Sequence, residues 1–272
     1  MDGGRRQAQG TATRPGPVQL RLLDGFELLR GGVALPLQPQ ARQLLAFLAL
    51  SARPVPRTLV ASRLWMDTSE QRAQANLRSA LWRLRHNGCP VLEQACGQLH
   101  LAADIAVDVR SAVDQARRLV AADQALEPED ERLAPLLAEL LPGWWEAWVL
   151  IERERLRQLQ LHALERLAER LLAAGRVAHA LDAALSAVAA EPLRESAQRL
   201  VVAIHLSEGN RSEALRQYAT YCALLRQEVG IGPSPHMARL VAELAADDGA
   251  PVAGHRVGAL AARGASAARV LP

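Results

Sequence analysis

The sequence contains no lysine, because all 32 basic residues of the 272 are arginine. This absence excludes a phosphate-loop lysine, a Schiff-base lysine and a lysine general base. Cys89, Cys96 and Cys222 match no metal-ligand spacing and leave an odd thiol, so a structural disulfide is not expected. No two of the seven histidines lie three or four residues apart, and no serine stands in a nucleophile elbow. We therefore expect neither an enzyme nor a metal or other cofactor.

Long apolar runs are also missing. No stretch approaches the roughly 18 residues that a membrane span requires, and the paired arginines near the start precede no apolar export segment. We expect a cytoplasmic, nucleoid-associated protein without a membrane partner. Residues 1–17 and 248–272 hold little to bury and are expected to be disordered.

Charge is divided unevenly along the chain. Residues 1–103 carry 13 arginines and 6 acids, for a net charge of +7, whereas residues 104–248 carry 16 arginines and 23 acids, for a net charge of −7. Such asymmetry indicates that one half meets a polyanion and the other does not. The sequence predicts two domains, at residues 18–103 and 104–247.

The first domain mixes short strands with helices. Apolar residues alternate over residues 18–37 around an Asp24-Gly25 turn and a Gly31-Gly32 turn, which predicts three antiparallel strands. Residues 40–50 and 57–65 follow helical periodicity, with Thr58 as the expected cap of the second helix. Residues 89–104 predict a hairpin that turns at Gly97.

A third helix is predicted within "DTSEQRAQANLRSALWRLRHNG", residues 67–88. Asp67 and Glu70 form a capping-box candidate, and Gly88 stands where a left-handed cap residue belongs. The residues expected to share the buried face are Ala73, Leu77, Ala80, Leu81 and Leu84. The far side carries Arg72, Asn76, Ser79, Arg83 and His86, with Trp82 beside them and Arg78 and Arg85 along the opposite edge.

Strands, three helices with a basic third one, and a following hairpin form the order of a winged helix, whose third helix enters the DNA major groove. Asparagine can bond adenine and arginine can bond guanine in two places, whereas arginines nearer the helix edges suit phosphates. An arginine-rich exposed face can also be simply solvated. The residues predicted to contact DNA are Arg57, Arg72, Asn76, Arg78, Ser79, Trp82, Arg83, Arg85, His86, Gln98 and His100.

Two of these residues have a structural alternative. For Trp82, packing against the wing or a neighbouring helix is favoured over stacking on a sugar or a thymine methyl. His100 lies on the expected wing, where it contacts a phosphate or has no role. Arg63 is, with Arg57, a further candidate for contact with the DNA backbone.

The second domain is predicted to be all-α. Aligning Gly175 with Gly209 and Ala180 with Ala214 gives an offset of 34 residues, the period of tetratricopeptide repeats. Before these repeats, Trp144, Trp145 and Trp148 are expected to be buried between a first helical hairpin and the repeats; a ligand pocket lined by them is the alternative. The fold class is therefore mainly α: a winged helix with a small sheet and wing, then a tetratricopeptide-like domain.

Several segments resemble a known family. "ARQLLAFLALSARPVPRTLVASRLW", "AQANLRSALWRLR" and "GQLHLAADIAVDV" resemble the OmpR-type winged helix of the Streptomyces antibiotic regulatory protein family. "LLPGWWEAWVLIERERLRQ" and "GIGPSP" resemble the bacterial transcriptional activator domain that accompanies it. The resemblance implies an activator of secondary metabolism that binds directly repeated promoter elements of double-stranded DNA as a homodimer and contacts RNA polymerase holoenzyme.

A rival hypothesis is an interaction scaffold in which the repeats bind a protein segment and the winged helix is itself a protein-contact module. The arginines of the third helix, which lack neutralising acids, favour DNA over this alternative. RNA is less favoured, because no aromatic platform on a sheet is evident.

Overall fold

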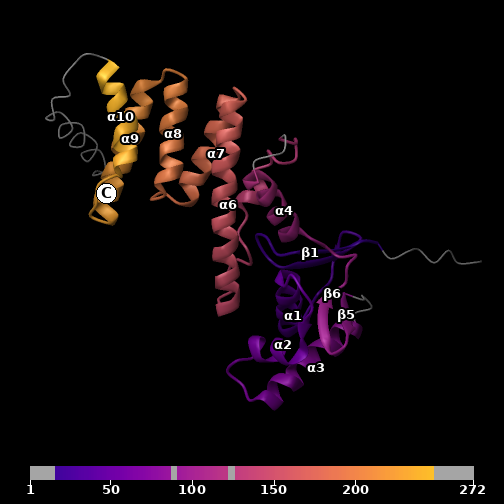
Figure 1. Ribbon diagram of the computed structural model, residues 1–272. Helices are drawn as coiled ribbons and strands as arrows, with labels where there is room; N and C mark the ends of the chain where they lie inside the picture. The colour runs from indigo at the N-terminus through magenta and orange to yellow at the C-terminus, as the bar shows by residue number, and fades with distance from the viewer. Residues whose placement is uncertain (1–15, 87–90, 122–125, 248–272) are drawn as a thin grey trace, which may run out of the picture. The chain divides into compact units, whose positions relative to one another are not determined.

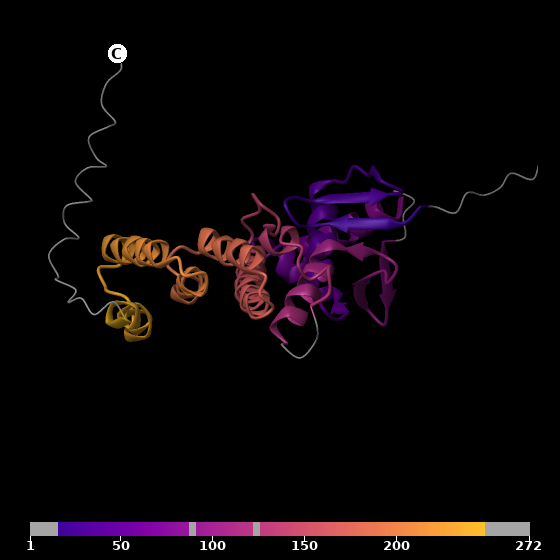
Figure 2. The same cartoon turned by 90° about the horizontal axis from the view of Figure 1, so that it is seen from above.

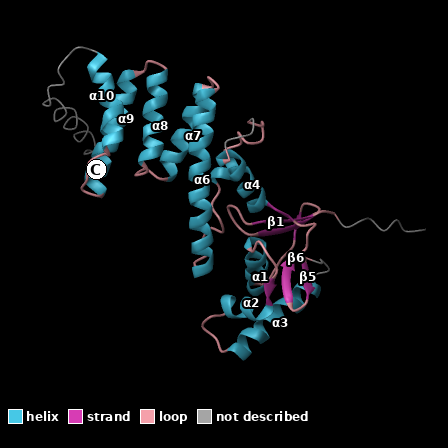
Figure 3. Ribbon diagram, viewed as in Figure 1, coloured by secondary structure: helices cyan, strands magenta, loops and turns pink. Residues whose placement is uncertain are grey.

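The structure, a computed structural model, describes residues 16–86, 91–121 and 126–247, with side chains described up to residue 242. Most of residues 1–17, the tail 248–272 and the expected Gly88 cap lie outside the described residues. The chain divides into two compact units, residues 1–166 and 167–272. Both are mainly helical, and the described strands all belong to the first unit (Figure 3).

The first unit opens with a small sheet. Its strands are β1 (Val18–Arg21), β2 (Glu27–Arg30), β3 (Val33–Ala34) and β7 (Ala106–Val107), in the order β3-β2-β1-β7. The first three are antiparallel, which confirms the prediction for residues 18–37. β7 pairs in parallel with β1 and was not predicted, because two residues carry no periodicity.

Three helices and a second sheet follow, in the order of a winged helix (Figure 1). The helices are α1 (Pro39–Leu50), α2 (Arg57–Leu64) and α3 (Glu70–His86). The strands are β4 (Val55–Pro56), β5 (Leu92–Ala95) and β6 (Gln98–Leu101), in the order β4-β6-β5. The predicted hairpin is thus confirmed. The expected cap at Thr58 is wrong, because α2 begins at Arg57 and its N-cap position, Pro56, has no side chain able to accept a hydrogen bond.

The same unit continues beyond the wing through α4 (Asp108–Val120), α5 (Ala134–Leu137) and the start of α6 (Ala147–Ala173). One hydrophobic core joins the winged helix to α4, to residues 140–141 and to the start of α6. It holds Leu20, Leu45 and Leu77 from the winged helix together with Leu141 and Val149 from the later segment. The core therefore does not stop at the end of the wing.

Polar contacts reinforce that continuity. The Asp108 carboxylate accepts hydrogen bonds from the backbone amides of Leu22, at 2.9 Å, and Leu23, at 3.0 Å. The carbonyls of Leu22 and Glu139 accept hydrogen bonds from the Leu141 and Asp24 amides at 2.8 and 2.7 Å. These bonds hold together segments that lie more than 80 residues apart in the chain.

The three tryptophans after residue 143 pack differently from the prediction. Trp144 stacks on Phe26, with ring centroids 5.9 Å apart, and Trp148 meets Phe47 edge to face at 5.4 Å. Both partners belong to the winged-helix part, so burial against the repeats is wrong for these two residues. Trp145 is 77% exposed, so burial is also wrong for this residue.

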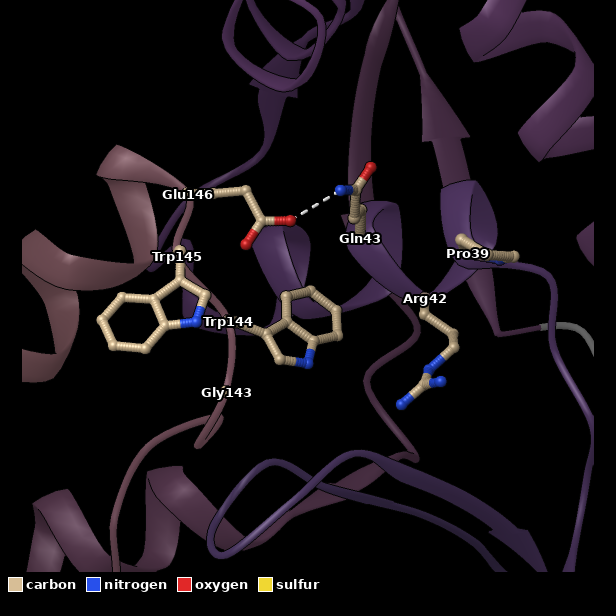
Figure 4. A pocket seen from close by; sticks show the side chains of 7 residues that line it. All are labelled: Pro39, Arg42, Gln43, Gly143, Trp144, Trp145 and Glu146. Carbon is tan, nitrogen blue, oxygen red and sulfur yellow. Dashed lines mark hydrogen bonds between the residues drawn. The ribbon is translucent and has the colours of Figure 1, made fainter.

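Figure 4 shows that Trp144 and Trp145 line an open hollow together with Arg42, Gln43 and Glu146. The Gln43 amide donates a hydrogen bond to the Glu146 carboxylate at 2.7 Å. The Arg42 guanidinium lies 4.9 Å from the centre of the Phe26 ring and 5.9 Å from that of Trp144. The alternative, a ligand pocket beside these tryptophans, stays a prediction.

The second unit takes up the end of α6 and the helices α7 (Val177–Ala190), α8 (Glu195–Ser207), α9 (Arg211–Glu228) and α10 (Pro235–Asp247) (Figure 2). Gly175 and Gly209 end α6 and α8 in the left-handed conformation, with φ of 73° and 75°. Ala180 and Ala214, one turn further on, are fully buried. These positions share conformation and burial at the 34-residue offset, and their assignment to tetratricopeptide repeats stays a prediction.

Candidate nucleic-acid interface

α3 packs on α1 and α2 through a purely apolar face. The buried residues of this helix are Ala73, Leu77, Ala80, Leu81 and Leu84, which confirms the predicted face. The capping prediction is wrong. The helix begins at Glu70 and the Ser69 carbonyl accepts the hydrogen bond of the Ala73 amide, which leaves Asp67 in the preceding turn.

The opposite side of α3 carries cations. Arg72, Arg78, Ser79 and Arg85 are exposed. Among the described residues, none of the α3 arginines forms an ion pair, and Glu70 is the only acid within the helix. The electrostatic field of this face therefore attracts anions without a competing internal partner.

Arg83 and Asn76 lie on the flank of α3 nearer to α1 and are half-buried. The Arg83 guanidinium donates a hydrogen bond from Nη1 to Oε1 of Gln40 at 3.0 Å. Gln40 belongs to the first turn of α1. A guanidinium has five N–H donors, so this single bond fixes the direction of Arg83 and leaves donors for a base edge.

Trp82 does not pack against the wing or a neighbouring helix, and that expectation is wrong. Its side chain is 60% exposed, and its ring stacks on His86 of the same helix with centroids 4.0 Å apart. His86 Nδ1 also lies 2.9 Å from the Trp82 carbonyl oxygen, to which it donates when that nitrogen carries the proton. The two rings, tilted by 32° to each other, present an aromatic surface next to the arginines.

The predicted DNA contacts on the wing and on α2 lie in different surroundings. Gln98 is exposed on β6, directly after the Cys96-Gly97 turn. Arg57 is anchored at the start of α2, where its Nη1 donates to Oε1 of Gln94 on β5 at 3.2 Å. His100 is half-buried, and its Nε2 lies 2.9 Å from the Glu93 carboxylate, so a phosphate would compete with this partner. Arg63 is exposed in the last turn of α2.

Gln40, Glu93 and Gln94 were missed by the sequence reasoning, although each fixes a residue that had been singled out. No local signal identifies them, because the partners meet only through tertiary packing. For metals, no group of three or more His, Cys, Asp or Glu side chains in the described part of the chain is placed to hold an ion. What the arrangement offers is a convex cationic helix face suited to a polyanion.

The chain is similar to known proteins. Residues 103–245 match the family model of the bacterial transcriptional activator domain. The regulatory protein AfsR of Streptomyces griseus is 30% identical over 240 residues, which cover 83% of this chain and 23% of that protein. AfsR of Streptomyces coelicolor is 29% identical over 260 residues, which cover 88% of this chain and 26% of that protein. The chain thus spans about a quarter of the length of these relatives.

A solved structure shares the fold. Mycobacterium tuberculosis EmbR, in complex with a low-affinity phosphopeptide, superposes with a TM-score of 0.68 at 20% identity over 86% of this chain and 66% of that one. No described helix combines the length and apolar character that a membrane crossing needs. The chain belongs to the family of bacterial transcriptional regulators defined by the bacterial transcriptional activator domain, as its resemblance to the Streptomyces antibiotic regulatory proteins predicted.

Proposed function

We propose that the chain is a sequence-specific transcriptional activator that places α3 in the major groove of promoter DNA. The observation that carries the proposal is the two-faced character of this helix. One face is sealed in the core by leucines and alanines, and the other presents arginines without an ion-pair partner among the described residues. A helix of this width fits the major groove, and unpaired arginines can replace the counterions of the phosphates.

We assign one flank of α3 to sequence readout and the other to contact with the DNA backbone. Asn76 and Arg83 lie near α1, and the hydrogen bond that Arg83 donates to Gln40 orients Arg83, so we assign these two side chains to base edges. Arg78 and Arg85 on the other edge, Arg72 on the open side and the anchored Arg57 are assigned to phosphates. Ser79, the Trp82-His86 pair and Gln98 complete the surface. His100 is the weakest member, because Glu93 already holds its ring.

The test uses the full chain and a DNA site selected with it from a random-sequence library. Fluorescence anisotropy then compares the selected duplex with a shuffled duplex at about 50 and about 200 mM salt. Arg83→Ala should weaken binding to the selected site by about 1 to 3 kcal/mol and change binding to the shuffled one little. Gln40→Ala should produce a smaller loss of the same kind, because it removes the orienting bond and keeps the guanidinium.

Arg78→Gln should instead weaken binding to both duplexes and reduce the salt slope by about 0.9, which is the mark of one phosphate contact. Arg239→Gln, an exposed arginine of α10, makes the same change of charge far along the chain and should leave both affinities unchanged. If Arg83→Ala weakens binding to the two duplexes equally, Arg83 does not read bases. Binding without salt dependence would refute the proposal and favour the protein-interaction scaffold.

The family resemblance extends the proposal to assembly on the promoter. We assign the chain to directly repeated elements, bound by two copies, with the activator domain contacting RNA polymerase holoenzyme and the genes of secondary metabolism as targets. Footprinting upstream of neighbouring genes would show two protected segments of the same orientation. One isolated protected segment, or an inverted pair, would contradict this part.

A further inference from the structure

A large hollow of the first unit lies away from the exposed face of α3. It is an open hollow of about 790 Å³ between the end of α1, the segment of residues 51–54, strand β6, and helices α4 and α6. Cavities of roughly 300–1,000 Å³ are those that proteins use for small molecules. All of its lining residues lie within residues 48–159, so the hollow belongs to one compact unit.

The floor of this hollow is apolar. Leu48, Val109 and Leu156 are buried in the core behind it, and Val113 and Leu159 are half-buried along its wall. Half-buried aliphatic side chains lose further contact with water when an apolar body covers them, which stabilises the complex. The floor thus favours a ligand with an apolar part.

The rim is cationic. Arg53, Arg110, Arg117 and Arg155 line it together with two acids, Asp114 and Glu152. Arg155 is paired with Glu152 at 2.9 Å, and Arg110 donates from Nε to the Ala49 carbonyl at 3.2 Å.

The guanidinium groups of Arg53 and Arg117 have no ion pair or side-chain hydrogen bond among the described residues. Two arginines without such a partner in the described part of the chain, at the edge of one apolar hollow, are an arrangement that an anionic group would complete.

A third feature is a buried polar atom without a partner. His100 lines the hollow, and its Nδ1 atom is buried and makes no hydrogen bond with any described group. Its other nitrogen is held by Glu93. A buried polar atom without a partner is destabilising, so a ligand group that bonds to it would remove that penalty.

We propose that this hollow binds a small amphipathic organic anion, with the apolar body over Val113 and Leu159 and the anionic head between Arg53 and Arg117. Carboxylate, sulfonate and phosphate heads share the chemistry that these two guanidinium groups recognise. The site is separate from the α3 surface and does not depend on DNA binding. Its test therefore succeeds or fails independently of the proposed function.

The test uses two fluorescent probes on the full chain without DNA: 8-anilinonaphthalene-1-sulfonate and its uncharged analogue N-phenyl-1-naphthylamine. The sulfonate should bind saturably at one site and more tightly than the analogue. Arg117→Gln and Arg53→Gln should each weaken sulfonate binding by about tenfold, as expected for one hydrogen bond to a charged group, and leave the analogue unchanged. Arg63→Gln, an exposed arginine of α2 outside the hollow, is the matched control and should change neither.

A competition with the unaltered chain keeps the test valid if a variant misfolds. Octanoate should displace the sulfonate, and octanol at the same concentration should not. The proposal is overturned if the sulfonate does not saturate, if Arg63→Gln weakens it as much as Arg117→Gln, or if octanol competes as well as octanoate. A loss confined to Arg42→Gln would also overturn it, because the probe would then occupy the tryptophan-lined hollow.

Discussion

Replacing Asp108 by alanine should destabilise the first unit by about 3–5 kcal/mol. The carboxylate accepts hydrogen bonds from the amides of Leu22, Leu23 and Val109 at 2.9, 3.0 and 2.7 Å. A hydrogen bond to a charged group contributes about 1.5–3 kcal/mol, so three lost together would cost about 4.5–9 kcal/mol if nothing replaced them. Because the site is only partly buried, water can satisfy some of the freed amides, which lowers the sum. The carboxylate also lies at the positive end of α4.

The measurement is urea unfolding followed by tryptophan fluorescence. All five tryptophans lie within residues 1–166, so the signal reports on the first unit alone. Asp108→Asn keeps one acceptor oxygen and should lose less than the alanine variant. Asp114→Ala, on the exposed side of the same helix, is the matched control and should cost at most about 0.5 kcal/mol.

Amide hydrogen exchange locates the effect. In the Asp108→Ala protein, the Leu22 and Leu23 amides should lose protection before the core of α1 does, because their acceptor is the group removed. If Asp108→Ala and Asp114→Ala unfold at the same urea concentration, the reasoning that ties residues 22–23 to α4 is refuted.

Two further predictions concern the wing and the second unit. Cys96 and Gly97 form the hairpin turn with φ of 50° and 76°. Cys96→Asn supplies the favoured Asn-Gly pair and should stabilise the chain by roughly 0.5–1 kcal/mol in the same urea assay. An unchanged midpoint would contradict this. Burial, with help from Glu195, raises the pKa of Tyr221 to about 12, so its neutral phenol stabilises the fold below pH 10 and that contribution is lost as pH rises from 10 through 12. Tyr218→Phe should leave one tyrosinate transition near pH 12, and a transition near 10 in the folded protein would refute the burial argument.

Local patterns account for what the sequence predicted correctly. The strands over residues 18–37 and the buried face of α3 follow from periodicity, which each segment carries within itself. β4 and β7 consist of two residues each and exist only because β6 and β1 lie beside them. Such strands have no period to detect. Thr58 and Asp67 are good cap residues in isolation, but packing of α2 and α3 sets helix starts at Arg57 and Glu70.

The candidate interface likewise combines features that local patterns predict with contacts that only tertiary packing creates. Exposure of Arg72, Ser79 and Arg85 could be predicted from the helical wheel, because it requires only knowledge of the apolar face. The bond between Arg83 and Gln40 could not, since it joins residues of two different helices. Exposed Trp82 was missed for a related reason: a large ring is usually buried, and here His86 of the same helix covers one of its sides.

The match to the activator domain begins at residue 103, but the physical unit that carries α3 extends to residue 166. Backbone hydrogen bonds join residues 22–24 to residues 139–141 across residue 103. Arg153 of α6 donates hydrogen bonds to the carbonyls of Leu140, Leu141 and Trp144 at 2.9, 2.6 and 3.0 Å. This fixes the segment that pairs with residues 22–24, which in turn extend β1.

Since close-packed interiors transmit strain, α4 and the start of α6 are mechanically part of the body that presents α3. A ligand held between α4 and residues 51–54 therefore acts on this body directly. It needs no signal from the second unit, because the segment of residues 51–54 links α1, which packs on α3, to β4 and α2.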